Sequence, residues 1–324
     1  MNIIVNGSKS LNMMLRPISS LALTDTVTSQ LKNHGFCYVN DILSESVLQS
    51  VSASEATCID AIQAARLCCK VPKSFSALDI LEEELLQAKI TTLSQTLDNI
   101  LDGGFQCRTV TELCGAPGSG KTQICMQISI NVQMSESHSG LGGQTLYIDT
   151  RSGLCIARLK EMAMASRVCF GDRNFDIDRI LKHIIVTQPQ SIDELSTVLG
   201  NFNELDKNCQ IRLIIVDSLS FRRYSIENTF HRTQKCFRIL DKLNKLATRF
   251  NLAVVVTNEL VTSFIANDDL VPASGLLCAH RVHKRFMLTR LDDNKFSACA
   301  MKTPTMPEVS SKFQVTAGGI RDIM

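Results

Sequence analysis

The segment Gly115-Ala-Pro-Gly-Ser-Gly-Lys-Thr122 decides the fold predicted for this chain. It has the pattern G-x-x-x-x-G-K-T and stands between an apolar run at 109–114 and a run of helical periodicity at 121–134. A strand, a loop of this pattern and a helix, in that order, form the phosphate-binding loop of nucleotide-binding α/β domains. The sequence therefore predicts an ATP site at the carboxyl end of the strand.

Each residue type in this loop has a role in holding phosphate. The glycines let backbone N–H groups converge on phosphate oxygens, and the helix N-terminus adds partial positive charge. Lys121 supplies a full charge to the β- and γ-phosphates, and the Thr122 hydroxyl is suited to ligate Mg²⁺. The predicted nucleotide contacts here are Gly115, Ala116, Pro117, Gly118, Ser119, Gly120, Lys121 and Thr122.

A second apolar run, Leu-Ile-Ile-Val-Asp at 213–217, ends in an acid. Taken alone, such a run is often an ordinary strand end. Because it lies downstream of a phosphate loop, Asp217 is predicted to hold Mg²⁺, directly or through water, together with Thr122.

Strand and helix patterns alternate along the middle of the chain. Predicted strands cover 109–114, 145–149, 184–186, 212–216 and 252–257, and predicted helices cover 121–134, 154–165, 191–199 and 228–250. Apolar strands between helices are typical of a parallel sheet covered on both faces. Three later segments without intervening helices are predicted to add antiparallel strands at one edge: 286–290, 296–301 and 313–315.

The predicted fold class is α/β, with a mostly parallel sheet, an antiparallel C-terminal extension and a small N-terminal α-helical domain. Residues 1–70 are expected to form that helical domain, 71–104 a linker and approach helix, and 105–324 the ATP-binding core. In the helical domain, Gly35 predicts a tight turn and Asp41 a helix cap.

Composition excludes several classes of protein. The 34 basic and 32 acidic residues leave a formal charge of +2, so any nucleic-acid site is expected to be local. The 13 cysteines include no C-x-x-C pair, which predicts reduced thiols and no structural zinc. No apolar run is long enough to cross a bilayer, so no membrane partner is expected.

Five further segments carry a resemblance. They are Leu-Cys-Gly-Ala-Pro-Gly-Ser-Gly-Lys-Thr-Gln-Ile-Cys-Met-Gln at 113–127, Tyr-Ile-Asp-Thr at 147–150, Leu-Ile-Ile-Val-Asp-Ser at 213–218, Val-Val-Val-Thr-Asn at 254–258 and Val-Pro-Ala at 271–273. Together they resemble the eukaryotic RecA-type recombinases. The phosphate loop and the segments at 97–104, 313–315 and 319–322 are most similar to the paralogue group lettered C.

The resemblance implies a RecA-like core that binds ATP and Mg²⁺ and acts in homologous recombination and DNA double-strand-break repair within a complex of paralogues. It implies other recombinase paralogues, the strand-exchange recombinase and single-stranded or junction DNA as partners. It also implies a nuclear location, with the cytoplasm as the alternative, and leaves a meiotic or somatic role open. By resemblance, Asn258 is the nucleotide sensor after its strand.

The resemblance also implies two DNA-binding loops. The first contains Arg222, Arg223 and Tyr224, which are suited to hold phosphates and stack on bases, although a short basic surface loop is the alternative. The second, at 261–274, is acidic, which argues against tight DNA contact. The helix at 228–250 has a basic face that is either a phosphate track or an ordinary solvated face; its members are Arg232, Lys235, Arg238, Lys242, Lys245 and Arg249.

Two departures from the family pattern affect catalysis. The segment at 149–153 reads Asp-Thr-Arg-Ser-Gly where the family has Asp-Thr-Glu-Gly, and a guanidinium is not a base at neutral pH. Glu259 follows Asn258 where the family has Gln. Because their charges are opposite, Arg151 and Glu259 are predicted to form a compensating pair; independent drift in a site without turnover is the alternative.

No catalytic residue is therefore assigned. The function expected is an ATP-binding recombinase paralogue with weak hydrolysis. The alternatives are an active DNA-dependent ATPase in strand exchange and a phosphate-loop scaffold without nucleotide turnover.

Overall fold

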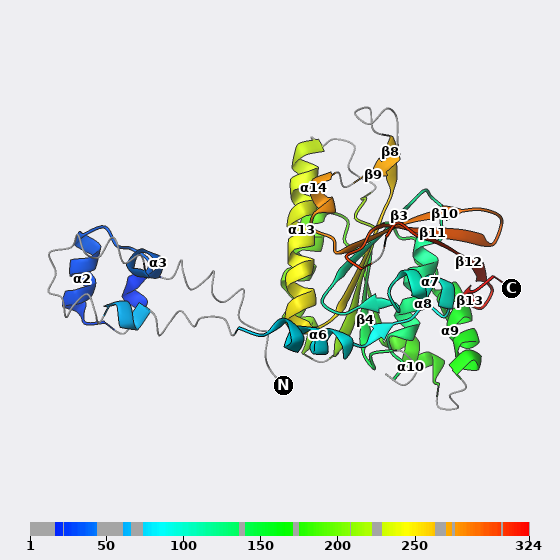
Figure 1. Cartoon of the computed structure of the whole chain (residues 1–324), viewed down its shortest axis with the longest axis horizontal. Coiled ribbons are helices and arrows are strands. Elements are labelled where there is room, and N and C mark those ends of the chain that lie inside the picture. The colour runs from blue at the N-terminus through cyan, green and yellow to red at the C-terminus, as the bar shows by residue number, and fades with distance from the viewer. Residues whose placement is uncertain are drawn as a thin grey trace. The chain divides into compact units, whose positions relative to one another are not determined.

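The computed structural model describes eleven parts of the chain, at 17–21, 23–43, 61–65, 74–135, 140–170, 175–207, 209–221, 229–262, 270–273, 276–305 and 307–323. The chain divides into two compact units, Met1–Glu84 and Leu85–Met324 (Figure 1). The division into 1–70, 71–104 and 105–324 stays a prediction.

The first unit is helical in its described residues. It contains η1 (Ile18–Ser20), α2 (Asp25–Asn33) and α3 (Val39–Leu43). Leu31 and Ile42 belong to its buried cluster. Gly35 has a positive φ of 87° in the turn that ends α2. Asp41 was expected as a helix cap ahead of the helix, but it lies inside α3 as its third residue. Its Oδ2 accepts hydrogen bonds from the N–H groups of Cys37 and Tyr38, just before the helix.

The described part of the second unit is built on a nine-stranded sheet of order β13-β12-β11-β10-β3-β7-β6-β4-β5. Its strands are β3 (Val110–Gly115), β4 (Gln144–Asp149), β5 (Ile184–Thr187), β6 (Ile211–Asp217), β7 (Ala253–Asn258), β10 (Lys284–Arg290), β11 (Lys295–Lys302), β12 (Ser310–Thr316) and β13 (Gly319–Arg321). The strands from β3 to β5 pair in parallel and those from β11 to β13 antiparallel, which confirms the predicted α/β class. One detail was wrong: β10 runs parallel to β3, so the antiparallel extension begins at β11.

Helices cover both faces of this sheet (Figure 1). They are α8 (Lys121–Asn131), α9 (Ile156–Phe170) and α10 (Ile177–Lys182) on one face, and α11 (Ile192–Gly200), α12 (Phe202–Asp206), α13 (Thr229–Phe250) and α14 (Leu276–Ala279) on the other. Along β6, Leu213 and Ile215 belong to the first apolar cluster, whereas Ile214 and Val216 belong to the second. A strand buried on both faces in this way needs a continuous apolar sequence.

Two two-stranded ribbons and a short helix, α7 (Gln95–Ile100), also belong to the second unit, and the helix α6 (Ala77–Leu85) lies at the boundary between the two units. The ribbons pair β1 (Lys89–Ile90) with β2 (Phe105–Gln106) and β8 (Leu260–Thr262) with β9 (Leu270–Pro272). Among the described residues, no helix is both long and apolar enough to span a bilayer.

The Asp322 carboxylate ties the end of the chain to the start of α7. It accepts hydrogen bonds from the Ser94 hydroxyl at 2.6 Å and from the Gln95 and Thr96 N–H groups at 3.0 Å each. Burial raises the pKa of Asp322, but these hydrogen bonds outweigh burial and lower its pKa overall. The segments at 94–96 and 319–322, far apart in sequence, are therefore joined in one clamp.

Candidate nucleotide-binding site

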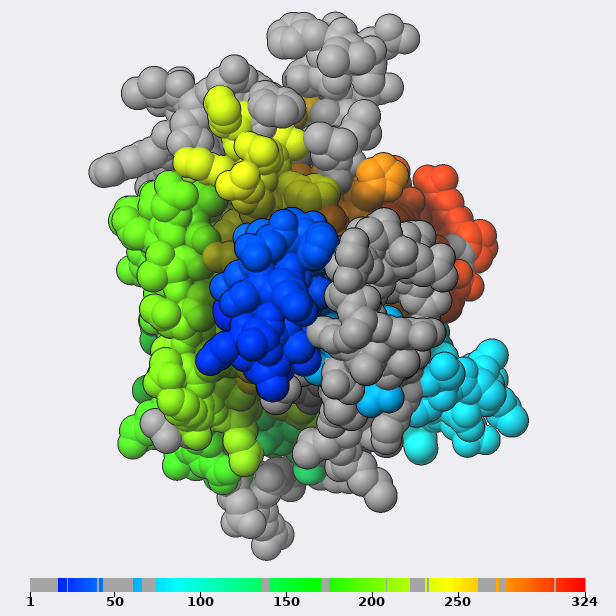
Figure 2. Space-filling view, turned by 90° about the vertical axis from the view of Figure 1, so that its left-hand side faces the viewer, coloured from blue at the N-terminus to red at the C-terminus, as the bar shows by residue number. Residues whose placement is uncertain are grey.

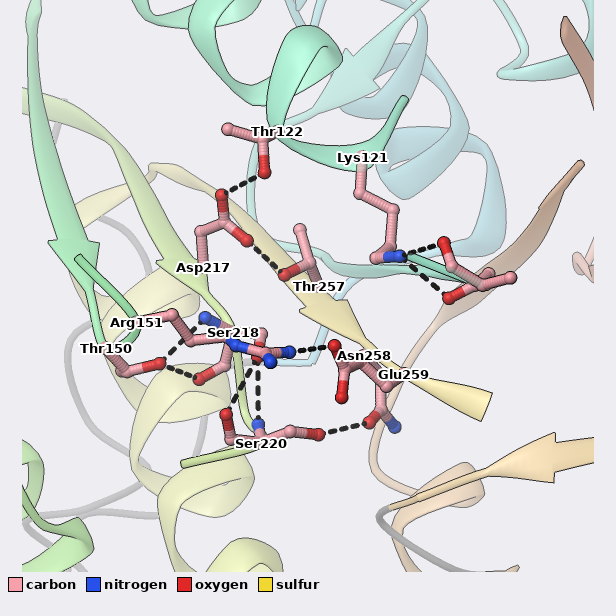
Figure 3. Close-up of polar contacts among 12 residues, drawn as sticks. Lys121, Thr122, Thr150, Arg151, Asp217, Ser218, Ser220, Thr257, Asn258 and Glu259 are labelled. Atoms are coloured by element: carbon pink, nitrogen blue, oxygen red, sulfur yellow. Dashed lines mark hydrogen bonds and ion pairs between the residues drawn. The ribbon is translucent and has the colours of Figure 1, made fainter. Parts of the chain in front are cut away.

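The carboxyl ends of β3, β4, β6 and β7 meet at one edge of the sheet, where the phosphate loop joins β3 to α8 (Figure 3). The loop requires glycine at its start, because a Cβ on Gly115 would lie 2.3 Å from Ser119 Oγ and 2.5 Å from Leu288 O. Gly120, the N-cap of α8, has a positive φ of 93°. The first turn of α8 leaves N–H groups without intrahelical partners, as an anion site needs.

Lys121 folds back over its own loop. Its ammonium donates to Gly115 O at 2.7 Å and to Ala116 O at 2.9 Å. Burial lowers the pKa of this ammonium, the Asp217 carboxylate opposes that shift, and the Arg151 guanidinium adds to it. These contacts with backbone carbonyl groups hold the ammonium within the loop, which is the position from which it can bind phosphate.

The Asp217 carboxylate, at the end of β6, accepts hydrogen bonds from three hydroxyl groups, and Figure 3 shows those from Thr122 and Thr257. Its Oδ2 accepts from Thr122 Oγ1 at 2.8 Å and from the Tyr147 hydroxyl at 2.9 Å, and its Oδ1 accepts from Thr257 Oγ1 at 2.6 Å. Burial, and then the charge of Asp217, raise the pKa of Tyr147 well above its ordinary value, so the phenol stays a donor. Mg²⁺ in phosphate sites usually takes one or two protein oxygens, and the Thr122–Asp217 pair fits that requirement.

Asn258 lies fully buried at the end of β7. Its Nδ2 donates to Glu112 Oε1 at 2.7 Å, and Ser220 Oγ donates to its Oδ1 at 3.3 Å. The amide therefore joins β7 to its neighbour β3 and to the segment after β6. Contact between Asn258 and a nucleotide stays a prediction.

Arg151 and Glu259 contact each other directly, Nη1 to Oε1, which confirms the predicted pairing (Figure 3). Arg151 lies just beyond β4 and Glu259 just beyond β7. Because β4 and β7 flank β6, the pair bridges the two strands on either side of Asp217. The side chains are 35% and 26% exposed, so this ion pair is partly accessible to solvent and does not belong to the core.

The turn that carries Arg151 is held by Asp149. The carboxylate accepts hydrogen bonds from the N–H groups of Arg151 at 3.2 Å, Gly153 at 3.1 Å and Leu154 at 3.1 Å. Gln188 Nε2 donates to it as well, at 3.3 Å. The backbone of the turn is thus fixed, while the Arg151 side chain extends from it.

The predicted DNA contacts Arg222, Arg223 and Tyr224 lie outside the described residues. On the basic face of α13, Lys235 pairs with Asp193 at 3.3 Å and Lys245 with Asp241 at 2.7 Å. Lys242 donates to Ser196 Oγ at 2.6 Å. Lys235, Lys242 and Lys245 are thus engaged within the chain, which favours the solvated-face interpretation over a phosphate track.

Sequence reasoning missed several residues at this edge of the sheet. Tyr147 and Thr257 orient Asp217, and Glu112 joins Asn258 to Arg285, whose Nε lies 2.7 Å from Glu112 Oε2. Glu112 is 1% exposed. The signal that points to it is an acid inside an otherwise apolar strand, which is costly unless the charge is paired.

A phosphate loop after a central strand, an acid at the end of a parallel strand two positions away and antiparallel strands at one edge define a RecA-like phosphate-loop domain. Residues 83–323 match the sequence model of the Rad51 family, so the chain belongs to that family. Over 254 residues it is 36% identical to the DNA repair and recombination protein RadA of Metallosphaera sedula, in an alignment that covers 76% of each chain.

Proposed function

We propose that this chain is an ATP-binding recombinase paralogue of the group lettered C, which assists homologous recombination and double-strand-break repair as a subunit of a paralogue complex. Membership of the Rad51 family and the role in DNA repair and recombination named for RadA support the recombination setting. The proposed ligands are ATP, held by the loop at 115–122, and Mg²⁺, held by Thr122 and Asp217. Bound Mg²⁺ supplies charge neutralisation at the phosphates.

The contact between Arg151 and Glu259 is the observation that carries this proposal. Proton abstraction from an attacking water needs a base, and a guanidinium cannot serve as one at neutral pH. The nearby carboxylate of Glu259 is neutralised by Arg151. The phosphate loop, Lys121 and Asp217 keep the residue types that binding needs, so the site supports nucleotide binding with weak hydrolysis.

The proposed partners are other recombinase paralogues, the strand-exchange recombinase and single-stranded or junction DNA. The helix α6 (Ala77–Leu85) supports assembly with another chain, because it has no buried residue and its leucines are exposed. Arg222, Arg223 and Tyr224 remain the proposed DNA contacts. The nucleus is the proposed location, by resemblance to the family.

Two competing functions make different predictions. An active DNA-dependent ATPase hydrolyses ATP faster when DNA is added, and a phosphate-loop scaffold binds no nucleotide. The test measures Mg-ATP binding and DNA-stimulated hydrolysis for the wild type and for Lys121→Ala. We expect binding with slow hydrolysis in the wild type and a loss of binding of roughly tenfold or more in Lys121→Ala, which lacks a charge-assisted contact.

A further variant tests why hydrolysis is slow. Arg151→Glu alone places two carboxylates side by side, which shifts the pKa of one of them, so the double variant Arg151→Glu/Glu259→Gln is the sharper choice. Since a positioned general base contributes about 10²–10⁴ in rate, we expect this variant to raise turnover by about tenfold or more. Wild-type hydrolysis as fast as that of a strand-exchange recombinase assayed beside it would establish the ATPase alternative, and absent binding would establish the scaffold.

A further inference from the structure

The Arg151 guanidinium has N–H groups that are available to a ligand. In the described part of the chain, its guanidinium makes one hydrogen bond, from Nη1 to Glu259 Oε1. Nε and Nη2 make none among these residues, and the side chain is 35% exposed. A guanidinium presents its N–H groups as a planar fork that matches phosphate oxygens in pairs. Arg151 can therefore accept an anionic ligand.

The position of Arg151 relative to the phosphate loop fits such a role. The Arg151–Glu259 pair joins the ends of β4 and β7 on either side of Asp217, and Asp217 accepts a hydrogen bond from Thr122 of the phosphate loop at 2.8 Å. The Arg151 charge also helps to lower the pKa of the Lys121 ammonium. The Asp149 carboxylate accepts hydrogen bonds from the backbone N–H groups of Arg151 and Gly153 and so holds the turn in place. The side chain can change its partner while its Cα stays in place.

Glu259 is suited to give up its contact. In the described residues its carboxylate has Arg151 as its ion-pair partner, and the side chain is 26% exposed. A partly exposed carboxylate that loses a partner can be rehydrated, which costs less than leaving a buried carboxylate unpaired. By contrast, Glu112 is 1% exposed, and releasing it from Arg285 would leave a buried charge unpaired.

We propose that Arg151 recognises the γ-phosphate and makes the site select nucleoside triphosphates over diphosphates, with Glu259 as the counter-ion that the phosphate replaces. This inference rests on the proposed function, since it requires nucleotide in the phosphate loop. The exchange keeps the guanidinium paired with an anion and substitutes a phosphate, with more charge and more acceptor oxygens, for a carboxylate. A diphosphate offers no such group, so Arg151 stays with Glu259 when ADP is bound.

Lys121 keeps a phosphate contact in both nucleotides, because a phosphate-loop lysine contacts both the β- and the γ-phosphate, so it discriminates less than a group that contacts the γ-phosphate alone. A competing role for the Arg151–Glu259 pair is purely structural, as a strut between the ends of β4 and β7. A strut affects both nucleotides alike, whereas a γ-phosphate contact affects the triphosphate alone. The ratio of the two affinities therefore separates the roles.

The experiment measures Kd for the Mg²⁺ complexes of ADP and of a non-hydrolysable ATP analogue, adenylyl imidodiphosphate, by titration calorimetry. It compares the wild type with Arg151→Met, Arg151→Lys and Glu259→Gln, and with Arg167→Met, an exposed arginine on α9, as the matched control. Thermal unfolding of each variant establishes that it is folded.

We expect Arg151→Met to weaken binding of the analogue by about tenfold or more and of ADP by less than about threefold, from the loss of a charge-assisted contact. Arg151→Lys should restore part of the selectivity, since it keeps the charge without the fork. Glu259→Gln should strengthen binding of the analogue alone, and Arg167→Met should change neither affinity.

Equal changes for the two nucleotides, or an unchanged ratio in Arg151→Met, would overturn the γ-phosphate assignment while the proposed function stands. Equal affinity of the wild type for both nucleotides would do the same. A wild type that binds neither nucleotide would instead refute the proposed function itself.

Discussion

Burial raises the pKa of Asp98 on α7 to about 6, hydrogen bonds from Thr92 oppose the shift, and the charge of Asp322 adds to it. An acid whose pKa is higher in the folded state than its unfolded value binds more protons when folded. Its ionisation therefore costs stability: the cost is fully present above about pH 6 and disappears as the pH falls toward 4. Ionised Asp98 therefore destabilises the folded state near neutral pH.

Asp98→Asn should remove that penalty. The amide Oδ1 can still accept the Thr92 N–H, which lies 2.8 Å from Asp98 Oδ1. We expect the free energy of unfolding to rise by about 1–3 kcal/mol at pH 8, and by less than half as much at pH 4.5. Urea unfolding at the two pH values measures this. Asp293→Asn, at a fully exposed side chain, is the control, and an equal gain at both pH values would contradict the role of ionisation.

The residue scale also shows what a sequence can and cannot reveal about the site. The phosphate-loop residues and Asp217 follow from a local motif, because their spacing along the chain fixes their chemistry. The role of Glu112 does not follow from a local motif, because its partners Asn258 and Arg285 lie 146 and 173 positions away. The pairing of Arg151 with Glu259 spans 108 positions, and it was predictable because both depart from one family pattern with opposite charge.

At the scale of elements, long segments were predicted better than short ones. The strands from β3 to β7 were predicted from their continuous apolar runs, whereas the helices α8, α9, α11 and α13 have enough residues to display a helical period. The helices α10 and α12, with 6 and 5 residues, have too few turns for that signal, and the sequence analysis did not identify them. The direction of β10 was also not predicted, because the direction of a strand depends on the path of the chain before it.

The helix α6 has an apolar face without a cover in its own described surroundings. Leu78, Leu81 and Leu85 follow helical spacing on one face and are 62%, 50% and 76% exposed. Figure 2 shows atoms of the cyan segment, which contains α6, at the surface. A nine-residue helix is marginal alone in water, so its apolar face is suited to packing against a partner chain.

Leu81→Glu should therefore weaken assembly without destabilising the chain. Because Leu81 is half exposed and makes no core contact, we expect a change of less than about 0.5 kcal/mol in the free energy of unfolding. Association, measured by sedimentation of the chain alone and mixed with a strand-exchange recombinase, should fall by about tenfold or more. Glu82→Gln, on the same helix, is the control. Unchanged association in Leu81→Glu would exclude this face as the contact surface.

At the scale of the whole molecule, the two units divide the proposed roles. The phosphate loop, Asp217, the Arg151–Glu259 pair and the Asp322 clamp all lie in Leu85–Met324. That unit has its own large apolar clusters on both faces of the sheet, so its burial of apolar surface is independent of the first unit. Nucleotide binding and partner binding are thus expected to be separable.

A chain that begins at residue 85 tests this separation. It keeps every residue of the nucleotide site and loses the apolar face of α6, which ends at Leu85. We expect its Kd for the Mg²⁺ complex of adenylyl imidodiphosphate to stay within about threefold of the full chain, since no contact of the site is removed, while its association falls as in Leu81→Glu. Calorimetry and sedimentation measure the two properties on the same sample. A truncated chain that unfolds cooperatively but has lost nucleotide affinity would show that the first unit supports the site, and would tie ATP binding to assembly in this molecule.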